Sequence, residues 1–107
     1  MTQEQRRLAA LMFADIVGYS AMAEQDERLA LRLLEEHRSA LRPILSRHSG
    51  RELKTMADGF LAQFDSAVDA ANCALQLQSE LAARNARVAP EERLLLRIGL
   101  HVGDVVV

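Results

Sequence analysis

The sequence is poor in aromatic residues and contains a single cysteine. It has no tryptophan, one tyrosine and three phenylalanines, so few rings are available for stacking on nucleic-acid bases. The formal net charge of -2 gives no basic surplus for binding a phosphate backbone. Cys73 stands alone, which excludes an intrachain disulfide and a thiolate metal cluster. We therefore expect a cytoplasmic domain that does not bind nucleic acid.

Long apolar runs and the common catalytic motifs are also missing. The apolar run from Leu8 ends at Asp15, well short of the roughly 18 residues that a membrane helix needs. No P-loop, Gly-x-Gly-x-x-Gly or Gly-x-Ser-x-Gly pattern occurs, which removes the usual signals of nucleotide triphosphatases, dinucleotide-binding enzymes and hydrolases. The three histidines have no partner at metal-ligand spacing, so we do not expect a zinc site. The segment is not expected to insert into a membrane.

Half of the residues are apolar and 26% are charged, which is typical of one globular domain spanning residues 1–107. The run Leu8–Ala14 predicts a strand buried on both faces. Ser20 is a candidate N-cap for a helix beginning at Ala21. Apolar residues at three- and four-residue spacing extend this helix to about His48. Pro43 is expected to break or kink it, so two consecutive helices are an alternative.

A hairpin and a second helical region follow. Residues Arg51 to Phe64 alternate in character around the turn Ala57-Asp58-Gly59, which predicts two paired strands. Ser66 begins a capping box and predicts a helix that ends near Asn85. The residues expected to face the core from this helix are Val68, Ala71, Leu75 and Leu81 or Ala82. Cys73 is expected to be a small core residue.

The run Leu94–Val102 predicts a last strand. The resulting order is strand, helix, strand, strand, helix, strand. This order is typical of the ferredoxin-like split βαβ core, an α+β fold with an antiparallel sheet and helices on one face.

Two carboxylates and one lysine are the candidate functional residues. Asp15 follows the first strand and precedes a turn and a helix start, where phosphates and a shared divalent cation could bind, although a simple turn aspartate is the alternative. Asp58 lies at the hairpin tip, where aspartate is also a common turn residue. If the two strands are neighbours, the carboxylates could share Mg²⁺ or Mn²⁺. Lys54 is either a surface charge or a contact to a base or phosphate.

Three segments together are more specific than any one of them. Residues Phe13–Ser20, Lys54–Phe60 and Arg97–Val105, in this order and at these separations, closely resemble the bacterial type of class III adenylate/guanylate cyclase catalytic domain. The resemblance runs from about Arg6 to the end of the chain. It implies conversion of ATP to 3′,5′-cyclic AMP and pyrophosphate by a two-metal mechanism.

The resemblance also assigns roles by position. Asp15, Asp58 and the Ile16 carbonyl would hold two Mg²⁺ or Mn²⁺ ions per site. Lys54 matches the position that contacts adenine and favours ATP. Because domains of this family pair head to tail, Lys54 would serve the metal site of the other subunit in a homodimer. The backbone amides offered to the phosphates would be those of Val17, Gly18, Tyr19 and Ser20.

Two departures from the family pattern affect these expectations. Ala57 stands where glycine is usual, which is tolerable if its φ is negative. The family domain continues past Val107 with a second adenine contact and the Asn and Arg that stabilise the transition state. We therefore regard the chain as the N-terminal portion of the domain and expect it to be nearly inactive alone. The alternatives are a non-catalytic cyclase-like module that binds nucleotide or a partner domain, and a generic ferredoxin-like interaction domain.

Overall fold

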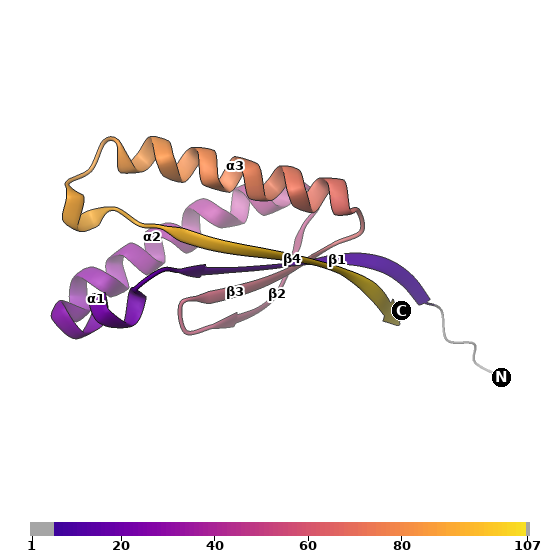
Figure 1. Ribbon diagram of the computed structural model, residues 1–107, viewed down its shortest axis with the longest axis horizontal. Coiled ribbons are helices and arrows are strands. Elements are labelled where there is room, and N and C mark those ends of the chain that lie inside the picture. Colours follow the sequence, from indigo (N-terminus) through magenta and orange to yellow (C-terminus); the bar gives the residue numbers. More distant parts are fainter. Residues whose placement is uncertain (1–5, 107) are drawn as a thin grey trace.

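The computed structural model describes the backbone of residues 6–106 and the side chains of residues 7–104. Four strands form one antiparallel sheet in the order β2-β3-β1-β4, and helices pack on one of its faces (Figure 1). The predicted element order and the ferredoxin-like fold are confirmed. The elements are β1 (Arg6–Ile16), α1 (Tyr19–Gln25), α2 (Glu27–Arg47), β2 (Arg51–Met56), β3 (Gly59–Phe64), α3 (Ala67–Asn85), the 3₁₀ turn η1 (Pro90–Glu92) and β4 (Leu96–Val106).

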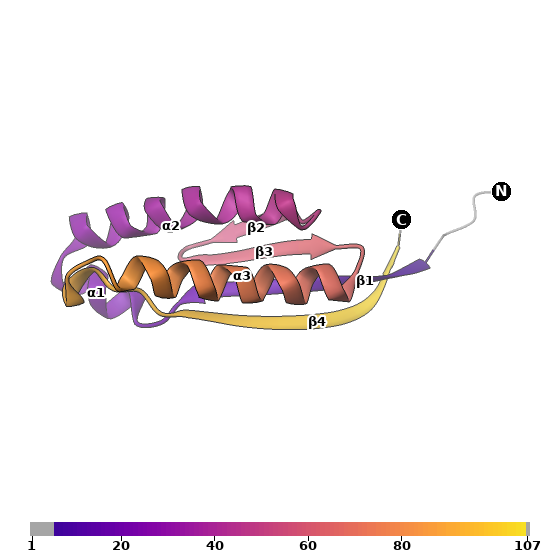
Figure 2. The same ribbon diagram turned by 90° about the horizontal axis from the view of Figure 1, so that it is seen from above.

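Strand β1 lies inside the sheet, between β3 and β4, but only one of its faces is covered. Its even-numbered residues from Ala10 to Ile16 belong to the core beneath the helices. Phe13, on the other face, is 47% exposed. The prediction of burial on both faces was wrong, because α1, α2 and α3 all lie on the same side of the sheet (Figure 2). The opposite side of the sheet is therefore open to solvent.

The first two helices meet at Asp26 rather than at Pro43. Asp26 adopts an extended conformation, and its carboxylate accepts a hydrogen bond from the Leu29 amide at 3.1 Å, which caps α2. The Ser20 N-cap was also wrong. Gly18, at φ 74°, precedes the first residue of α1, and Ser20 lies inside that helix. A glycine at this position takes the left-handed conformation without steric cost.

Helix α2 continues through Pro43. Proline lacks the amide that would bond to the Ser39 carbonyl. Both residues are on the exposed face of the helix, so water can hydrate that carbonyl. The buried face consists of the predicted stripe that includes Leu33, His37 and Leu41, and its packing keeps the helix continuous across the proline.

Helix α3 begins as predicted, with the Ser66 hydroxyl accepting a hydrogen bond from the Asp69 amide at 3.2 Å. Its predicted core face was wrong in part: Leu81 packs against the core, but the face as a whole is rotated about the helix axis. Val68 and Leu75 are 67% and 69% exposed. The buried residues are instead Ala70, Cys73 and Leu77. Apolar residues occur on two faces of this helix, so two apolar stripes were compatible with the sequence. The prediction that Cys73 is a core residue is confirmed.

Strand β4 forms one edge of the sheet and pairs with β1 along the whole of both strands. Leu100 and Val102 of β4 are 46% and 51% exposed. An edge strand with exposed apolar residues is a surface on which further chain or another subunit can pack. Within residues 6–106, no helix combines the length and the apolar character needed to cross a membrane.

Candidate active site

The turn between β2 and β3 reaches the end of β1. Asp58 lies in this turn, and its Oδ2 accepts a hydrogen bond from the backbone amide of Ile16 at 2.9 Å. Ile16 is the last residue of β1 and directly follows Asp15. Although Asp15 and Asp58 are far apart in the sequence, the fold thus brings them to the same end of the sheet. The sequence had raised this placement as a possibility that depended on the strand order.

Asp15 is held by an arginine of the neighbouring strand. Arg97 lies directly opposite Asp15 in the β1–β4 pairing. Its Nε and Nη2 atoms donate to the two carboxylate oxygens, each at 3.0 Å. These hydrogen bonds, together with the charge of Asp15, raise the pKa of Arg97, and the charge of Asp58 adds to the effect. The Arg97 guanidinium is therefore paired with Asp15 and is also influenced by the charge of Asp58.

The turn that carries Asp58 is strained at the preceding residue. Ala57 has a φ of 49°, in the left-handed region that glycine adopts more easily than alanine. The sequence analysis had made the tolerance of this alanine depend on a negative φ, and the structure gives the opposite sign. The Arg38 guanidinium of α2 donates a hydrogen bond to the Ala57 carbonyl. This contact fixes the turn against the helix layer.

The segment after Asp15 offers fewer amides than expected. The Val17 amide donates to the Leu95 carbonyl at 2.9 Å, so it is already used within the fold. Gly18, Tyr19 and Ser20 form the left-handed residue and the first turn of α1, where backbone amides have no partner within the helix. Of the four predicted phosphate-binding positions, the last three remain suited to that role.

Lys54 is on the open face of the sheet. It pairs with Leu61 of β3, which in turn pairs with Phe13 of β1, so these side chains share a face with Asp15. Lys54 is exposed, and no ion pair or hydrogen bond of its side chain occurs among the described residues. A hollow of about 460 Å³ on this side is lined by Phe13, Asp15 and Arg97, among others. Lys54 does not line that hollow.

The two carboxylates fit the chemistry of a Mg²⁺ or Mn²⁺ site in part. Carboxylate and carbonyl oxygens are the ligands that these ions prefer. The described part of the chain nowhere brings three His, Cys, Asp or Glu side chains together, so Asp15 and Asp58 would need help from the Ile16 carbonyl and from a bound triphosphate. Asp15 would also have to exchange Arg97 for the ion.

Two residues of this region were missed as site residues at the sequence level. Arg97 was noted only as the first residue of a motif, and its pairing with Asp15 follows from the register of β1 against β4. Arg38 was not singled out in the sequence. No local signal identifies it, because its partner is a backbone carbonyl 19 residues away in the chain.

Comparisons with known proteins identify the family. The model of the adenylate and guanylate cyclase catalytic domain matches residues 1–107. The chain belongs to this family. A protein named "Putative adenylate cyclase 3" from Rhizobium meliloti (strain 1021) is 45% identical over 104 residues, which is 95% of the chain. Retinal guanylyl cyclase 2 of Rattus norvegicus is 28% identical over 108 aligned residues and covers 92% of the chain.

Solved structures of cyclases share the fold. An adenylate/guanylate cyclase/hydrolase from Silicibacter pomeroyi superposes with a TM-score of 0.85 at 36% identity, over 98% of this chain and 62% of that one. A bacterial light-regulated adenylyl cyclase gives a TM-score of 0.86 at 25% identity, over 94% of this chain and 55% of that one. The chain spans 18% of the Rhizobium protein and 10% of the rat protein. It therefore corresponds to only part of each relative.

Proposed function

We propose that this cyclase-family chain binds ATP with Mg²⁺ or Mn²⁺ and contributes one half of a site that forms cyclic AMP. The observation that carries the proposal is the hydrogen bond from the Ile16 amide to Asp58, which puts a second carboxylate beside Asp15. Two such groups at one sheet end need a cation beside them; Arg97 provides it in the structure, and in this proposal divalent ions take its place. Two bound ions would activate the ribose 3′-hydroxyl and stabilise the pyrophosphate leaving group.

Different residues of the chain are proposed to bind the metal ions and the phosphates. Asp15, Asp58 and the Ile16 carbonyl supply metal ligands. Backbone amides from Gly18 to Ser20 are proposed to bind phosphate oxygens, because they lie at a helix start directly after Asp15. Release of Arg97 from Asp15 frees a guanidinium at the same place.

We propose that Lys54 determines the preference for adenine. An ammonium can donate to ring nitrogens of adenine but cannot accept a hydrogen bond. The relatives include proteins named as adenylate and as guanylyl cyclases, so the preference for adenine over guanine has to be measured. Lys54→Glu should lower the affinity for ATP relative to the affinity for GTP in a binding competition. An unchanged ratio of the two affinities would contradict this role.

We also propose that the chain forms a homodimer. The face that carries Lys54 also exposes Phe13, and a head-to-tail homodimer would bring Lys54 of each subunit to the carboxylates of the other. The exposed edge of β4 leaves further apolar surface for association. In sedimentation experiments, we expect Phe13→Lys to shift the chain towards monomer. A wild type that is monomeric at every accessible concentration contradicts this proposal.

Turnover by the 107-residue chain alone should be very low. The family residues that stabilise charge at the α-phosphate are not found within this sequence. Loss of even one such donor costs on the order of a hundredfold in rate. We propose that metal and nucleotide binding largely survive in the chain, whereas cyclisation needs the segment that follows in the family domain.

The decisive experiment separates binding from turnover. Mn²⁺ and ATP binding are measured by calorimetry for the wild type, Asp15→Asn and Asp58→Asn, and cyclic AMP formation is assayed for the same chain and for one extended by the family's following segment. We expect binding in the wild type, loss of binding in both variants, and robust cyclic AMP only from the extended chain. Robust activity of the short chain would refute this division of roles.

A non-catalytic module is the second candidate. The bidentate contact of Arg97 with Asp15 favours it, because a carboxylate that is already neutralised is a weaker metal ligand. In that case the extended chain would also be inactive, or its activity would be unaffected by Asp15→Ala.

A further inference from the structure

The hairpin loop that carries Asp58 is short, and its backbone conformation is unfavourable for its sequence. Met56 of β2 pairs with Gly59 of β3, so Ala57 and Asp58 alone form the loop. Ala57 has a φ of 49°, although residues with a side chain strongly prefer negative φ. The conformation of this loop therefore has to be held by contacts from outside it.

The position of the Asp58 carboxylate depends on this loop. Strand β1 pairs with β3 only as far as Ala14, which lies opposite Phe60. Beyond that point, the Ile16 amide donates its hydrogen bond to Oδ2 of Asp58 at 2.9 Å. The carboxylate thus takes the place of a backbone acceptor at the end of the pairing. Because the peptide group between Ala57 and Asp58 leads directly into the Cα atom of Asp58, rotation of that group would turn the carboxylate away.

Arg38 of α2 holds this peptide group. Its guanidinium donates a hydrogen bond to the Ala57 carbonyl, which is the oxygen of the same peptide group. Hydrogen bonds from a charged donor are stronger than those between neutral groups. Arg38 is also half-buried, so part of its side chain is already ordered by packing. The contact is therefore suited to stabilising the left-handed conformation of Ala57.

A second arginine of α2 reaches the same hairpin at a different place. Arg42 lies one helical turn after Arg38, and its Nε is 3.5 Å from Oε2 of Glu52. Glu52 is near the start of β2, at the end of the strand away from the loop. Of the two arginines, Arg38 alone contacts the peptide group before Asp58. Arg42 is therefore a matched control for charge and for attachment of the hairpin to the helix.

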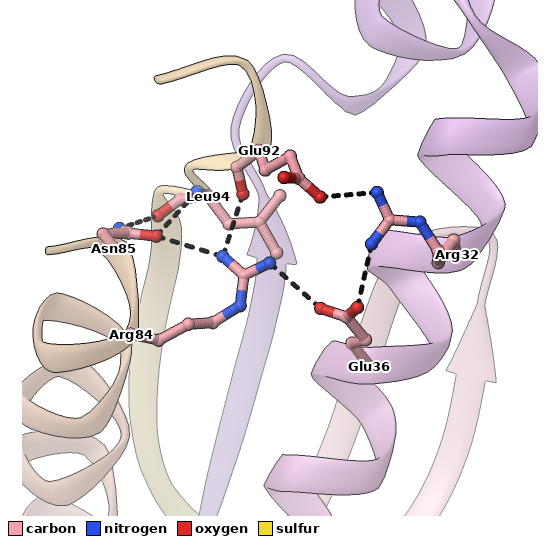
Figure 3. Close-up of polar contacts among 6 residues, drawn as sticks. All are labelled: Arg32, Glu36, Arg84, Asn85, Glu92 and Leu94. Atoms are coloured by element: carbon pink, nitrogen blue, oxygen red, sulfur yellow. Dashed lines mark hydrogen bonds and ion pairs between the residues drawn. The ribbon is translucent and has the colours of Figure 1, made fainter. Parts of the chain in front are cut away.

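Helix α2 is held in place by a network of charged side chains close to Arg38. Glu36 accepts hydrogen bonds from Arg32 of the same helix and from Arg84 of α3, each at 3.0 Å (Figure 3). Arg32 and Arg84 also donate to the side chain and the backbone carbonyl of Glu92 in η1. These contacts fix α2 against α3 and η1. The guanidinium that holds the loop thus extends from a helix whose position is set independently of the loop.

We propose that Arg38 is a positioning residue for metal binding, which holds the peptide group before Asp58 so that the carboxylate keeps the orientation a divalent cation needs. This inference rests on the proposed function, in which Asp58 is a metal ligand. Without the contact, Ala57 would also adopt negative φ, and only a fraction of the molecules would present the carboxylate correctly. The apparent affinity for the ion falls in proportion to that fraction.

The expected effect has the opposite sign to a simple charge effect. Removal of a positive charge near a cation site reduces repulsion and by itself strengthens binding of the ion. Loss of positioning weakens it. Arg38→Met and Arg42→Met each remove one guanidinium from α2 and keep a long unbranched side chain. A comparison of these two variants therefore separates positioning from charge.

The first measurement needs no metal. Hydrogen exchange of the Ile16 amide reports how often its bond to Asp58 is open, and amides in the middle of β1 correct for changes in global stability. We expect Arg38→Met to accelerate exchange at Ile16 by about fivefold relative to those amides, as loss of one net hydrogen bond implies. Arg42→Met should leave the ratio unchanged, and Arg38→Lys, which keeps a charged donor, should stay near the wild type. An unchanged ratio in Arg38→Met would overturn the proposal.

The second measurement is the affinity for Mn²⁺, followed by electron paramagnetic resonance of the free ion. We expect Arg38→Met to weaken binding by about fivefold and Arg42→Met to leave it unchanged or slightly stronger. Adding Ala57→Gly to Arg38→Met should restore most of the lost affinity, because glycine adopts the left-handed conformation without support.

The outcomes distinguish this inference from the proposed function. If the wild type binds Mn²⁺ and Arg38→Met binds it equally well or more tightly, the positioning role is refuted while the metal site stands. Lack of restoration by Ala57→Gly would refute the role as well, since the loop conformation would then not be the cause. If the wild type itself does not bind Mn²⁺, the proposed metal site is refuted, and the positioning role with it.

Discussion

Arg97 donates two hydrogen bonds of 3.0 Å to the Asp15 carboxylate, and the two residues are direct partners in the pairing of β1 with β4. The geometry is the bidentate contact for which guanidinium and carboxylate are matched. The backbone register brings the groups together, so the contact needs no special loop. The guanidinium thus occupies the position beside the Asp15 carboxylate in which a bound metal ion would lie.

The first prediction concerns this competition. Replacing Arg97 with methionine should strengthen Mn²⁺ binding by about fivefold, the range in which an exposed ion pair contributes. The change removes the competing cation and leaves the Asp15 carboxylate in place. Affinity is measured by electron paramagnetic resonance of free Mn²⁺. Arg28→Met, which removes one positive charge from an exposed position on α2, controls for net charge and should have a much smaller effect. Weaker binding in Arg97→Met would show instead that Arg97 supports the site.

The second prediction separates the two carboxylates by their effect on stability. Asp58→Ala removes the hydrogen bond to the Ile16 amide and should reduce the free energy of unfolding by about 1–2 kcal/mol. Asp58→Asn retains an acceptor oxygen and should cost less. Asp15→Ala loses only an exposed pair and should change stability little. Urea unfolding measures all three, and equal losses for Asp15→Ala and Asp58→Ala would contradict the structure.

The third prediction concerns the strained alanine. Ala57→Gly should raise the free energy of unfolding by about 0.5–1 kcal/mol, because relief of the left-handed strain exceeds the entropy that glycine adds to the unfolded chain. Ala86 has a φ of -70°, so Ala86→Gly should destabilise the chain and serves as the matched control. Stabilisation by both changes, or by neither, would exclude backbone strain at Ala57.

The fourth prediction follows from the pKa of His37, which is lowered by burial and then by the charges of Arg38 and Arg84. The unfolded chain takes up a proton near pH 6.5, whereas the folded chain takes it up at lower pH, so stability is lost as the pH falls below about 6.5. Between pH 7.5 and 5.5, this histidine should account for a measurable part of the loss. Urea midpoints of wild type and His37→Phe at both pH values test it. The same comparison for exposed His101 is the control, and an unchanged pH dependence in His37→Phe would contradict the prediction.

Much of the fold could be predicted because local signals were clear. The Ser66 cap, the hairpin turn at Asp58 and the apolar stripe of α2 each depend on residues close together in the sequence, and these are present in the structure. The errors arose where local signals were ambiguous. Helix α3 has apolar residues on two faces, so packing rather than pattern decided that Cys73, and not Leu75, faces the core.

The placement of the two candidate carboxylates at one end of the sheet was predictable, but their contacts were not. Asp15 and Asp58 were named from the motifs, and the strand order explains why both lie at that end. Their partners could not be foreseen. Arg97 reaches Asp15 through the pairing of β4 with β1, and Arg38 reaches the hairpin turn from a helix, so both contacts depend on the tertiary structure.

The pairing of β1 with β4 has a consequence for synthesis on the ribosome. It joins Ile16 to Leu96 and Arg6 to Val106, so this edge of β1 is paired only once β4 has been made. Until that segment leaves the exit tunnel, β1 has an unpaired edge and the core is open on one side. Such non-local pairing slows folding and exposes a nascent chain to aggregation. We therefore expect this domain to fold late in translation and to need protection of β1 while the rest of the chain emerges.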